Sequence, residues 1–273
     1  MNTTGNTRRF LKMEGLGNDF VIFDARAHDL TLRDEAVRHI ADRRRGVGCD
    51  QLIVMRASQD ADVFMEIRNA DGSRVGACGN ATRCVGRLML DESGKDTVTI
   101  RTDAGLLSAT RANTGIKVNM GPARLSWNEI PLAREMDTLN IDFSLGALST
   151  PVGVNMGNPH AVFFVDDAEA VDLETLGPKI EHDALFPERV NVSVAHVKDG
   201  IIRQRVWERG AGITEACGSG ACAGLVAAAR RGLTGRKATV MLDGGPLDIE
   251  WLEDGTVEMT GAATLAYTGE IVL

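Results

Sequence analysis

The sequence has no long hydrophobic run, and this lack argues against a membrane-spanning protein. Its longest apolar stretch, residues 221–229, is about half of the roughly 18 residues that a transmembrane helix needs. The first nine residues are polar and lack the apolar core of a secretory signal. Positive charge is also in short supply, because 30 Lys and Arg face 38 Asp and Glu, for a net charge of −8. We therefore expect no nucleic-acid partner and no membrane partner.

Cysteine is scarce, and its spacing is not that of a metal site. The five cysteines are Cys49, Cys78, Cys84, Cys217 and Cys222. An odd number in a chain of 273 residues without an export signal predicts reduced thiols and a cytoplasmic protein. The sequence contains no CxxC pair, and Cys78 and Cys84 are too far apart for the usual zinc knuckle. The thiols are therefore either buried packing residues or reactive groups.

The length and the residue pattern predict about two domains of the α+β class. Short alternating apolar segments are separated by turn signals, as in the hairpin that joins 191–197 to 201–208 through an Asp-Gly turn. Helices are fewer, and one of them is predicted to be capped by Thr31. The helices are expected at 32–41, 79–92, 173–182 and 219–231, and further strands at 21–24, 52–56, 63–68, 98–101, 116–120, 161–165, 240–242, 249–252 and 256–259.

An internal repeat is the most informative feature of the chain. Four landmarks recur 139 or 140 residues further on: Gly17-Asn18 as Gly157-Asn158, Gln51 as Asn191, Asn69 as Glu208, and Ala77-Cys78-Gly79 as Ala216-Cys217-Gly218. We therefore expect two similar lobes about a pseudo-twofold axis, with equivalent residues facing the cleft between them. The expected division is 1–122 plus 264–273 for the N-terminal lobe and 123–263 for the C-terminal lobe. The final strand, 267–273, could belong to either half.

The repeat places one cysteine in each half, directly before a small-residue turn that opens a predicted helix. A helix N-terminus offers unpaired N–H groups and partial positive charge. It should lower the pKa of an adjacent thiol and provide a pocket for a carboxylate. Two such thiols on opposite faces of one carbon describe a stereoinversion site, in which one removes the α-proton and the other delivers a proton. Cys78 and Cys217 are the candidates for this pair.

Lysine is also scarce, which bears on the choice of cofactor. Amino-acid racemisation commonly uses pyridoxal phosphate as an electron sink. None of the six lysines (12, 95, 117, 179, 198 and 237) lies in a Gly-rich phosphate-binding context. We therefore expect no cofactor and no metal, and a route that stabilises the developing charge in a dry, preorganised cleft.

With these residues in view, the chain resembles the diaminopimelate epimerase family over essentially its whole length. The segments that carry the resemblance are 15–20, 46–51, 69–73, 77–84, 156–161, 189–191, 208–212 and 216–221. The resemblance implies an enzyme that interconverts LL- and meso-diaminopimelate in lysine and peptidoglycan precursor biosynthesis, without pyridoxal phosphate or metal. It also implies two similar lobes, each a curled, mostly antiparallel sheet wrapped around a central helix, and a homodimer.

The resemblance further assigns site residues. It implies that Cys78 and Cys217 are the proton donor and acceptor, exchanging roles with the direction of reaction. The implied substrate contacts are Asn18, Gln51, Asn69, Gly79, Asn80, Asn158, Asn191, Glu208, Arg209, Gly218 and Ser219. Arg209 can grip a carboxylate and Glu208 can pair with an ammonium group. Adjacent strand residues point to opposite faces, so both can enter one site only through a bend, which Gly210 could supply.

Other functions are compatible with the same sequence features. The same fold could racemise proline, hydroxyproline or histidine, although such substrates give Arg209 no second carboxylate to bind. A thiol-redox protein with a Cys78–Cys217 disulfide is a rival of another class. Glu208 and Arg209 could form only a surface ion pair. His160 either lines the site or is a turn residue, whereas Cys84 and Cys222 are expected in the core.

Overall fold

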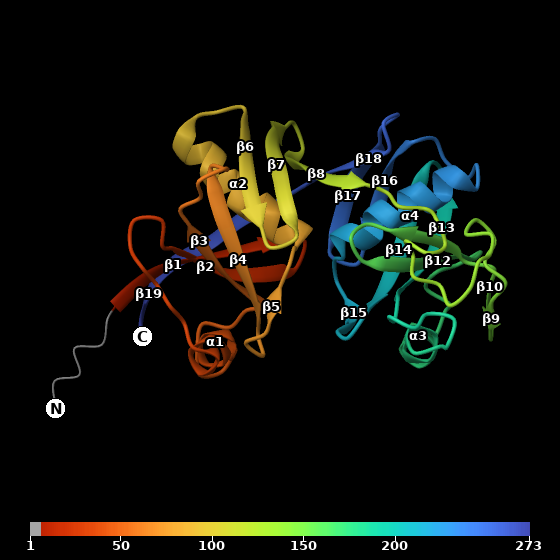
Figure 1. Ribbon diagram of the computed structural model, residues 1–273, viewed down its shortest axis with the longest axis horizontal. Coiled ribbons are helices and arrows are strands. Elements are labelled where there is room, and N and C mark those ends of the chain that lie inside the picture. The colour runs from red at the N-terminus through yellow and green to blue at the C-terminus, as the bar shows by residue number, and fades with distance from the viewer. Residues whose placement is uncertain (1–6) are drawn as a thin grey trace. The chain divides into compact units, whose positions relative to one another are not determined.

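The computed structural model describes residues 7–273. The first six residues, which include most of the polar N-terminal stretch, lie outside the described residues. The rest packs into two compact units, one formed by residues 7–118 with Gly261–Leu273 and the other by Asn119–Thr260 (Figure 1). Among the helices of the described residues, none is long and apolar enough to span a bilayer. The lobe boundaries expected from the sequence stay a prediction.

The first unit contains a sheet whose two most buried strands are covered on both faces. Its elements are β1 (Thr7–Gly15), β2 (Asn18–Asp24), α1 (Asp34–Ala41), β3 (Gln51–Arg56), β4 (Val63–Asn69), β5 (Arg74–Val75), α2 (Gly79–Ser93), β6 (Thr97–Thr102), β7 (Gly105–Ala112), β8 (Gly115–Pro122, which continues past Val118) and β19 (Thr264–Val272). Helix α1 covers one face of β2 and β3, and α2 packs against β1, β6 and β7. Successive residues of β2 and β3 are buried, so both faces of these strands are covered. This explains why both strands are near-continuous apolar runs.

The second unit repeats this plan. Its elements are β9 (Ser144–Leu145), β10 (Leu148–Ser149), β11 (Val152–Asn155), β12 (Pro159–Phe164), α3 (Leu173–Glu181), β13 (Asn191–Lys198), β14 (Ile201–Glu208), β15 (Gly212–Thr214), α4 (Gly218–Arg230), β16 (Lys237–Leu242), β17 (Gly245–Trp251) and β18 (Thr256–Gly261). Helix α3 packs against β13 and β14, whereas the Ala- and Gly-rich α4 is buried against β11–β14, β16 and β17. Small side chains let α4 lie close to the strands around it.

Strand register confirms the repeat predicted from the sequence. In the first unit β2 pairs parallel to β3 with Phe20 opposite Gln51, and in the second β12 pairs parallel to β13 with His160 opposite Asn191. A second parallel pair recurs in the same way, β4 with β6 and β14 with β16. Most of the remaining ladders are antiparallel, so each unit is a mixed, mostly antiparallel sheet with few helices. This is the predicted α+β class.

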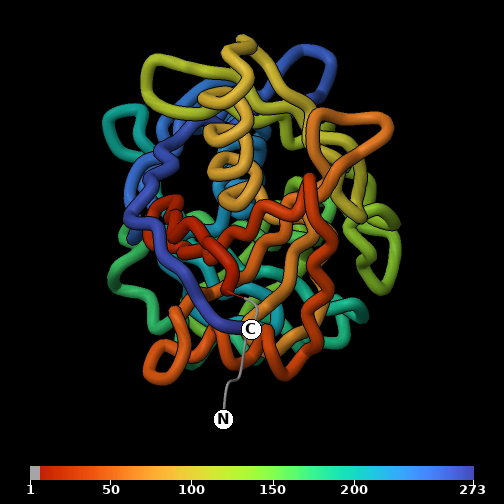
Figure 2. The backbone as a smooth tube through the Cα atoms, turned by 90° about the vertical axis from the view of Figure 1, so that its left-hand side faces the viewer, coloured from red at the N-terminus to blue at the C-terminus, as the bar shows by residue number. Residues whose placement is uncertain are grey.

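The C-terminal strand belongs to the first unit, a point that the sequence left open. Strand β19 pairs antiparallel with β1 from Thr264 opposite Glu14 to Val272 opposite Thr7, with one irregularity beside Lys12. Figure 2 shows this blue segment running beside the red N-terminal strand. Chain ends that pair in one sheet tie the first unit together across the whole length of the sequence.

Local turn chemistry was predicted well, and one helix start was not. Asp199 and Gly200 both have positive φ, 52° and 78°, as a two-residue hairpin turn requires. Helix α1 begins at Asp34, with Arg33 rather than Thr31 at the cap and no side-chain capping bond. The predicted Thr31 cap was therefore wrong. Asp34 and Glu35 lie in the first turn of α1, where negative charge is favourable.

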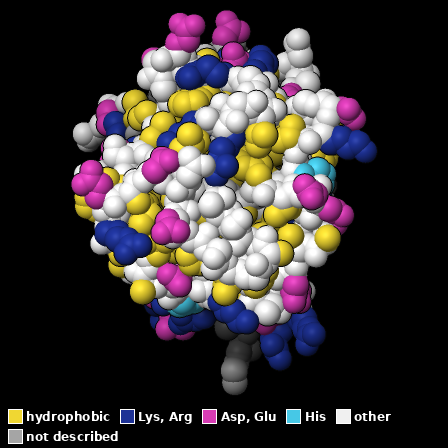
Figure 3. All heavy atoms as spheres, turned by 90° about the vertical axis from the view of Figure 1, so that its right-hand side faces the viewer, with side chains coloured by type: hydrophobic (Ala, Val, Ile, Leu, Met, Phe, Trp, Pro, Cys, Tyr) yellow, Lys and Arg dark blue, Asp and Glu magenta, His cyan; other side chains and the backbone are white. Residues whose placement is uncertain are grey.

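On the face shown in Figure 3, charged side chains of both signs lie dispersed among apolar ones.

Candidate functional site

Cys78 directly precedes α2 and occupies its N-cap position in an extended conformation. The thiol is half-buried. Its Sγ lies 3.8 Å from Oδ1 of Asn18, and the same oxygen accepts a 3.2 Å hydrogen bond from Nδ2 of Asn80. Asn80 is itself buried and accepts a bond from Arg83 at 2.9 Å. The structure thus groups Cys78, Asn18 and Asn80, three of the predicted site residues of the first unit.

An ionic network that the sequence reasoning missed fixes the amide of Asn18. Asp50 Oδ2 accepts from Asn18 Nδ2 at 2.9 Å, and because a carboxylate only accepts, the amide oxygen of Asn18 must face Cys78. Arg43 bridges Asp50 and Asp19, and Asp19 also pairs with the buried Lys12. Burial opposes ionisation of Asp19, but bonds from Arg43 and Lys12 outweigh it and hold its pKa well below the usual value. The sequence signals were the positions of Asp19 beside Asn18 and of Asp50 beside Gln51.

Gln51 and Asn69 are opposite each other on β3 and β4. Gln51 Nε2 donates to Asn69 Oδ1 at 3.1 Å, and Asn69 Nδ2 donates to Ser73 Oγ at 3.1 Å. The remaining amide oxygen of Gln51 is buried, with no hydrogen-bond partner among the described residues. A buried acceptor left unpaired is costly, so this oxygen is suited to an ammonium group of a ligand.

Cys217 occupies the equivalent N-cap of α4 but is more deeply buried, with 4% of its surface exposed. Its Sγ lies 3.6 Å from Oγ of Ser219, and a Cβ at Gly220 would come within 3.2 Å of it. Burial raises the pKa of the Cys217 thiol well above the ordinary value, and the charge of Glu208 raises it further. The predicted lowering by the helix N-terminus was therefore wrong for Cys217, because desolvation exceeds the effect of the helix end.

The side chains of Glu208, the last residue of β14, and Arg209, the residue after it, bind different partners. The Glu208 carboxylate accepts a 2.5 Å bond from Thr214 Oγ1, while the exposed Arg209 donates through Nη1 to the carbonyl oxygen of Glu188 at 2.9 Å. Gly210 follows with φ 75°, which supplies the predicted bend. The two side chains are therefore not confined to opposite faces of a continuous strand.

Asn158 directly precedes β12, His160 is the second residue of that strand, and Asn191 is the first residue of β13. Asn158 Oδ1 lies 3.0 Å from Nε2 of His160, which is fully buried. Asn191 donates to the carbonyl oxygen of Pro159 at 2.8 Å and accepts from the Arg209 backbone N–H at 2.9 Å. Asn191 thus connects the start of β12 to the turn after β14. Its contact with substrate stays a prediction, as does that of every other predicted site residue of both units.

His160 leads to a prediction about acid stability. Burial lowers its pKa from the usual 6.5 to about 3, with a smaller contribution from the positive charge of Arg209. Because the unfolded chain binds this proton first, stability is complete above pH 6.5 and falls as the pH drops toward 3. As the pH falls from 6 to 4.5, we expect His160 to lower the free energy of unfolding by about 1.4 kcal/mol per pH unit.

Urea unfolding of the wild type and of His160→Gln across this range measures the effect. The variant should start less stable at pH 7 and show a flatter pH dependence. Asp19 and the other carboxylates with lowered pKa lose their contribution below about pH 5, and they do so equally in the two proteins. Parallel curves for the two proteins between pH 6 and 4.5 would contradict a buried neutral His160.

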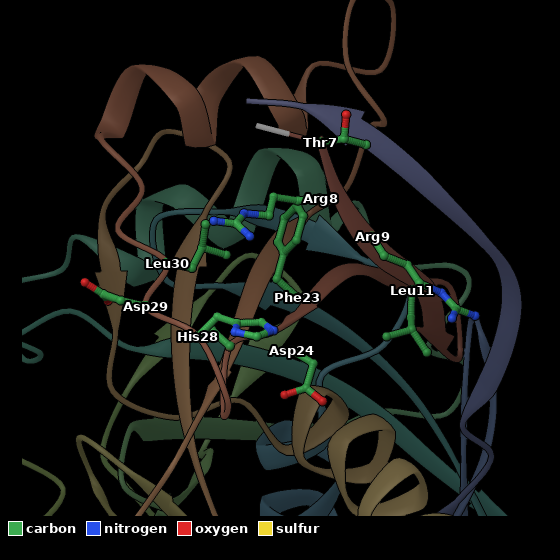
Figure 4. A pocket seen from close by; sticks show the side chains of 10 residues that line it. Thr7, Arg8, Arg9, Leu11, Phe23, Asp24, His28, Asp29 and Leu30 are labelled. Carbon is green, nitrogen blue, oxygen red and sulfur yellow. The ribbon is translucent and has the colours of Figure 1, made fainter. Parts of the chain in front are cut away.

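The first unit also contains a cavity of about 400 Å³ that holds none of the predicted site residues (Figure 4). It is lined by Thr7, Arg8, Arg9, Leu11, Phe23, Asp24, Ala25, His28, Asp29 and Leu30. In Figure 4 the side chains of Arg8, His28 and Asp24 lie around it. Charges of both signs line this cavity.

Comparison with solved structures bears on the fold. A phenazine biosynthesis protein from Bacillus anthracis aligns with TM-score 0.69 and 16% identity over 98% of this chain and 100% of that one. A probable proline racemase from Agrobacterium radiobacter aligns with TM-score 0.69 and 17% identity, over 97% of this chain and 93% of its own. At such low identity the likeness establishes the shared fold and nothing more.

Comparison with sequences is more specific. The diaminopimelate epimerase of Rhodospirillum centenum is 60% identical over 268 residues, covering 97% of this chain and 92% of that protein. That of Acidiphilium cryptum is 54% identical over 266 residues, covering 97% and 96%. The family model for diaminopimelate epimerase matches residues 10–126 and 152–266. Cys78 and Cys217 also precede equivalent helices in the two units. The chain belongs to the diaminopimelate epimerase family.

Proposed function

We propose that this protein interconverts LL- and meso-diaminopimelate by proton transfer between two cysteines, without cofactor or metal. The observation that carries the proposal is the equivalence of Cys78 and Cys217, each at the N-cap of the helix that follows a short strand, β5 in one unit and β15 in the other. Family membership supplies the substrate, because the relatives at 60% and 54% identity bear that name. We place the enzyme in the cytoplasm, in lysine and peptidoglycan precursor synthesis.

In this mechanism the thiolate of one cysteine removes the α-proton and the thiol of the other protonates the opposite face. The α-carbon of an amino acid is a weak acid, so the carboxylate must be stabilised as charge develops on it. The N–H groups that open α2 and α4, at Gly79, Asn80, Gly218 and Ser219, are suited to this role. Each cysteine is acid in one direction and base in the other.

The second stereocentre of the substrate calls for an asymmetric site. Arg209 can pair with its carboxylate, and Glu208 or the unpaired oxygen of Gln51 can accept from an ammonium group. At the equivalent position the first unit has Asn69 instead of a charged residue, so the two units differ where the substrate halves differ. Proline, hydroxyproline and histidine have one carboxylate and leave Arg209 unused.

Incubation with LL-diaminopimelate in deuterated water, with chiral analysis and no added cofactor, tests the proposal. We expect the meso product with one deuterium at the inverted carbon. Product without solvent deuterium would contradict proton transfer through exchangeable thiols, and turnover of proline or histidine instead would reassign the substrate. Mass spectrometry with and without reductant checks that loss of activity does not simply reflect a Cys78–Cys217 disulfide.

We further propose a homodimer. Strand β19 exposes Leu265, Tyr267 and Val272, with 39%, 48% and 63% of their surface accessible. Light scattering of the purified protein reports the oligomeric state directly, and a monomer at all concentrations would contradict this assignment.

A further inference from the structure

A buried carboxylate at the end of α3 is outside the predicted site but bonded to the turn that carries Arg209. The side chain of Glu181, the last residue of α3, is only 3% exposed. Its Oε2 accepts from Trp207 Nε1 at 2.8 Å, and its Oε1 accepts from the backbone N–H of Gly210 at 2.9 Å. These two donors flank Glu208 and Arg209 in sequence.

The location of this carboxylate is energetically unfavourable by itself. Burial penalises a charged group, and the C-terminal end of a helix carries partial negative charge that repels it. Hydrogen bonds must therefore offset both costs. The half-exposed Arg189 forms a loose ion pair with Glu181, with Nη1 3.8 Å from Oε1. The direct bonds of Glu181, however, go to Trp207 and to the backbone of the turn.

The backbone at Arg209 is consequently held at two successive N–H groups. Asn191 binds the N–H of Arg209, and Glu181 binds the N–H of Gly210. Both acceptors are buried and come from different elements, β13 and α3. Gly177 reinforces the contact between α3 and β14, because a Cβ there would lie 2.5 Å from Trp207 Cγ. The guanidinium of Arg209 remains exposed at the end of this fixed backbone.

We propose that Glu181 is a positioning residue that sets the place of Arg209 for the second carboxylate of the substrate. The proposal rests on the proposed function for the identity of that carboxylate. It assigns Glu181 no contact with substrate, only the task of holding the turn after β14. A binding group must be held to within a fraction of an ångström to act on its ligand, and fixed backbone supplies that precision.

Glu181→Gln tests the proposal with almost no change in shape. A glutamine has one oxygen and one NH₂, so either Trp207 Nε1–H or the Gly210 N–H must face a donor instead of an acceptor. We expect the KM for diaminopimelate to rise roughly tenfold while kcat changes less than about threefold. Amide hydrogen exchange at Gly210 should accelerate by about tenfold or more. Glu181→Asp, which keeps the charge but is too short to reach both donors, should act in the same direction.

Asp172→Ala is the matched control on the same helix. Asp172 caps the N-terminus of α3 by accepting from the Thr175 N–H at 3.1 Å and makes no bond to the turn after β14 among those of the described residues. The control should lower the melting temperature without moving KM or exchange at Gly210. Equal KM increases in both variants, or unchanged KM and exchange in Glu181→Gln, would overturn the proposal.

Different measurements test the proposed function and the role of Glu181. If the wild type does not turn over diaminopimelate, the proposed function fails regardless of Glu181. Exchange at Gly210 needs no substrate, so it still decides whether Glu181 holds the turn. Faster exchange in Glu181→Gln together with an unchanged KM on an active enzyme overturns the positioning role alone.

Discussion

Replacing either Cys78 or Cys217 by serine is expected to lower epimerisation by roughly 10³-fold while leaving the protein folded. A hydroxyl is a far weaker acid than a thiol, so serine supplies neither the base nor a matched acid. Serine is close to cysteine in size and is itself a favoured N-cap residue, so α2 and α4 should still form from residues 78 and 217 onward. The loss should therefore be chemical rather than structural.

Initial rates in both directions, with melting curves for each variant, measure this effect. Cys84→Ser is the matched control, because Cys84 is buried in α2 and a serine hydroxyl can replace its bond to the Glu14 carbonyl oxygen. The control should retain activity within about threefold. A Cys217→Ser or Cys78→Ser enzyme with near wild-type rates, or a control that falls as far, would refute the assignment.

Arg209→Ala should produce the second largest loss, roughly 10²-fold in kcat/KM for diaminopimelate. A charge-assisted, forked contact to a carboxylate is worth about 3 kcal/mol, which corresponds to this factor. In the structure Arg209 makes a bond to the Glu188 carbonyl oxygen that a substrate carboxylate can replace or accompany. Its backbone N–H bond to Asn191 is retained in the variant, so the turn itself should persist.

Free lysine, used as an alternative substrate, distinguishes the loss of a contact to the second carboxylate from a general loss of activity. Lysine is diaminopimelate with the second carboxylate replaced by hydrogen. Solvent deuterium exchange at its α-carbon should be slow in the wild type and almost unaffected by Arg209→Ala. If the variant slows lysine and diaminopimelate by the same factor, Arg209 acts elsewhere than on the second carboxylate. Arg209→Lys should recover part of the loss, since charge returns without the forked geometry.

The local features of the fold could be predicted from the sequence because they depend on neighbouring residues. The turn at Asp199-Gly200 requires positive φ at both positions, and Asp and Gly are residue types that tolerate positive φ. Helices α2 and α4 were predicted to within one residue of their starts. Helix α1 was not, because tertiary packing rather than a capping side chain sets its first turn.

The sequence alone determined the repeat, the α+β class and the two equivalent cysteines, because a fixed offset survives in the order of residues whatever their packing. Only the tertiary structure decided which groups surround each thiol. Asp50 orients Asn18, and Glu181 holds the turn of Arg209, through bonds that span 32 and 29 residues of chain. The raised pKa of Cys217 likewise follows from burial and from Glu208, since desolvation exists only once the chain has closed around the thiol.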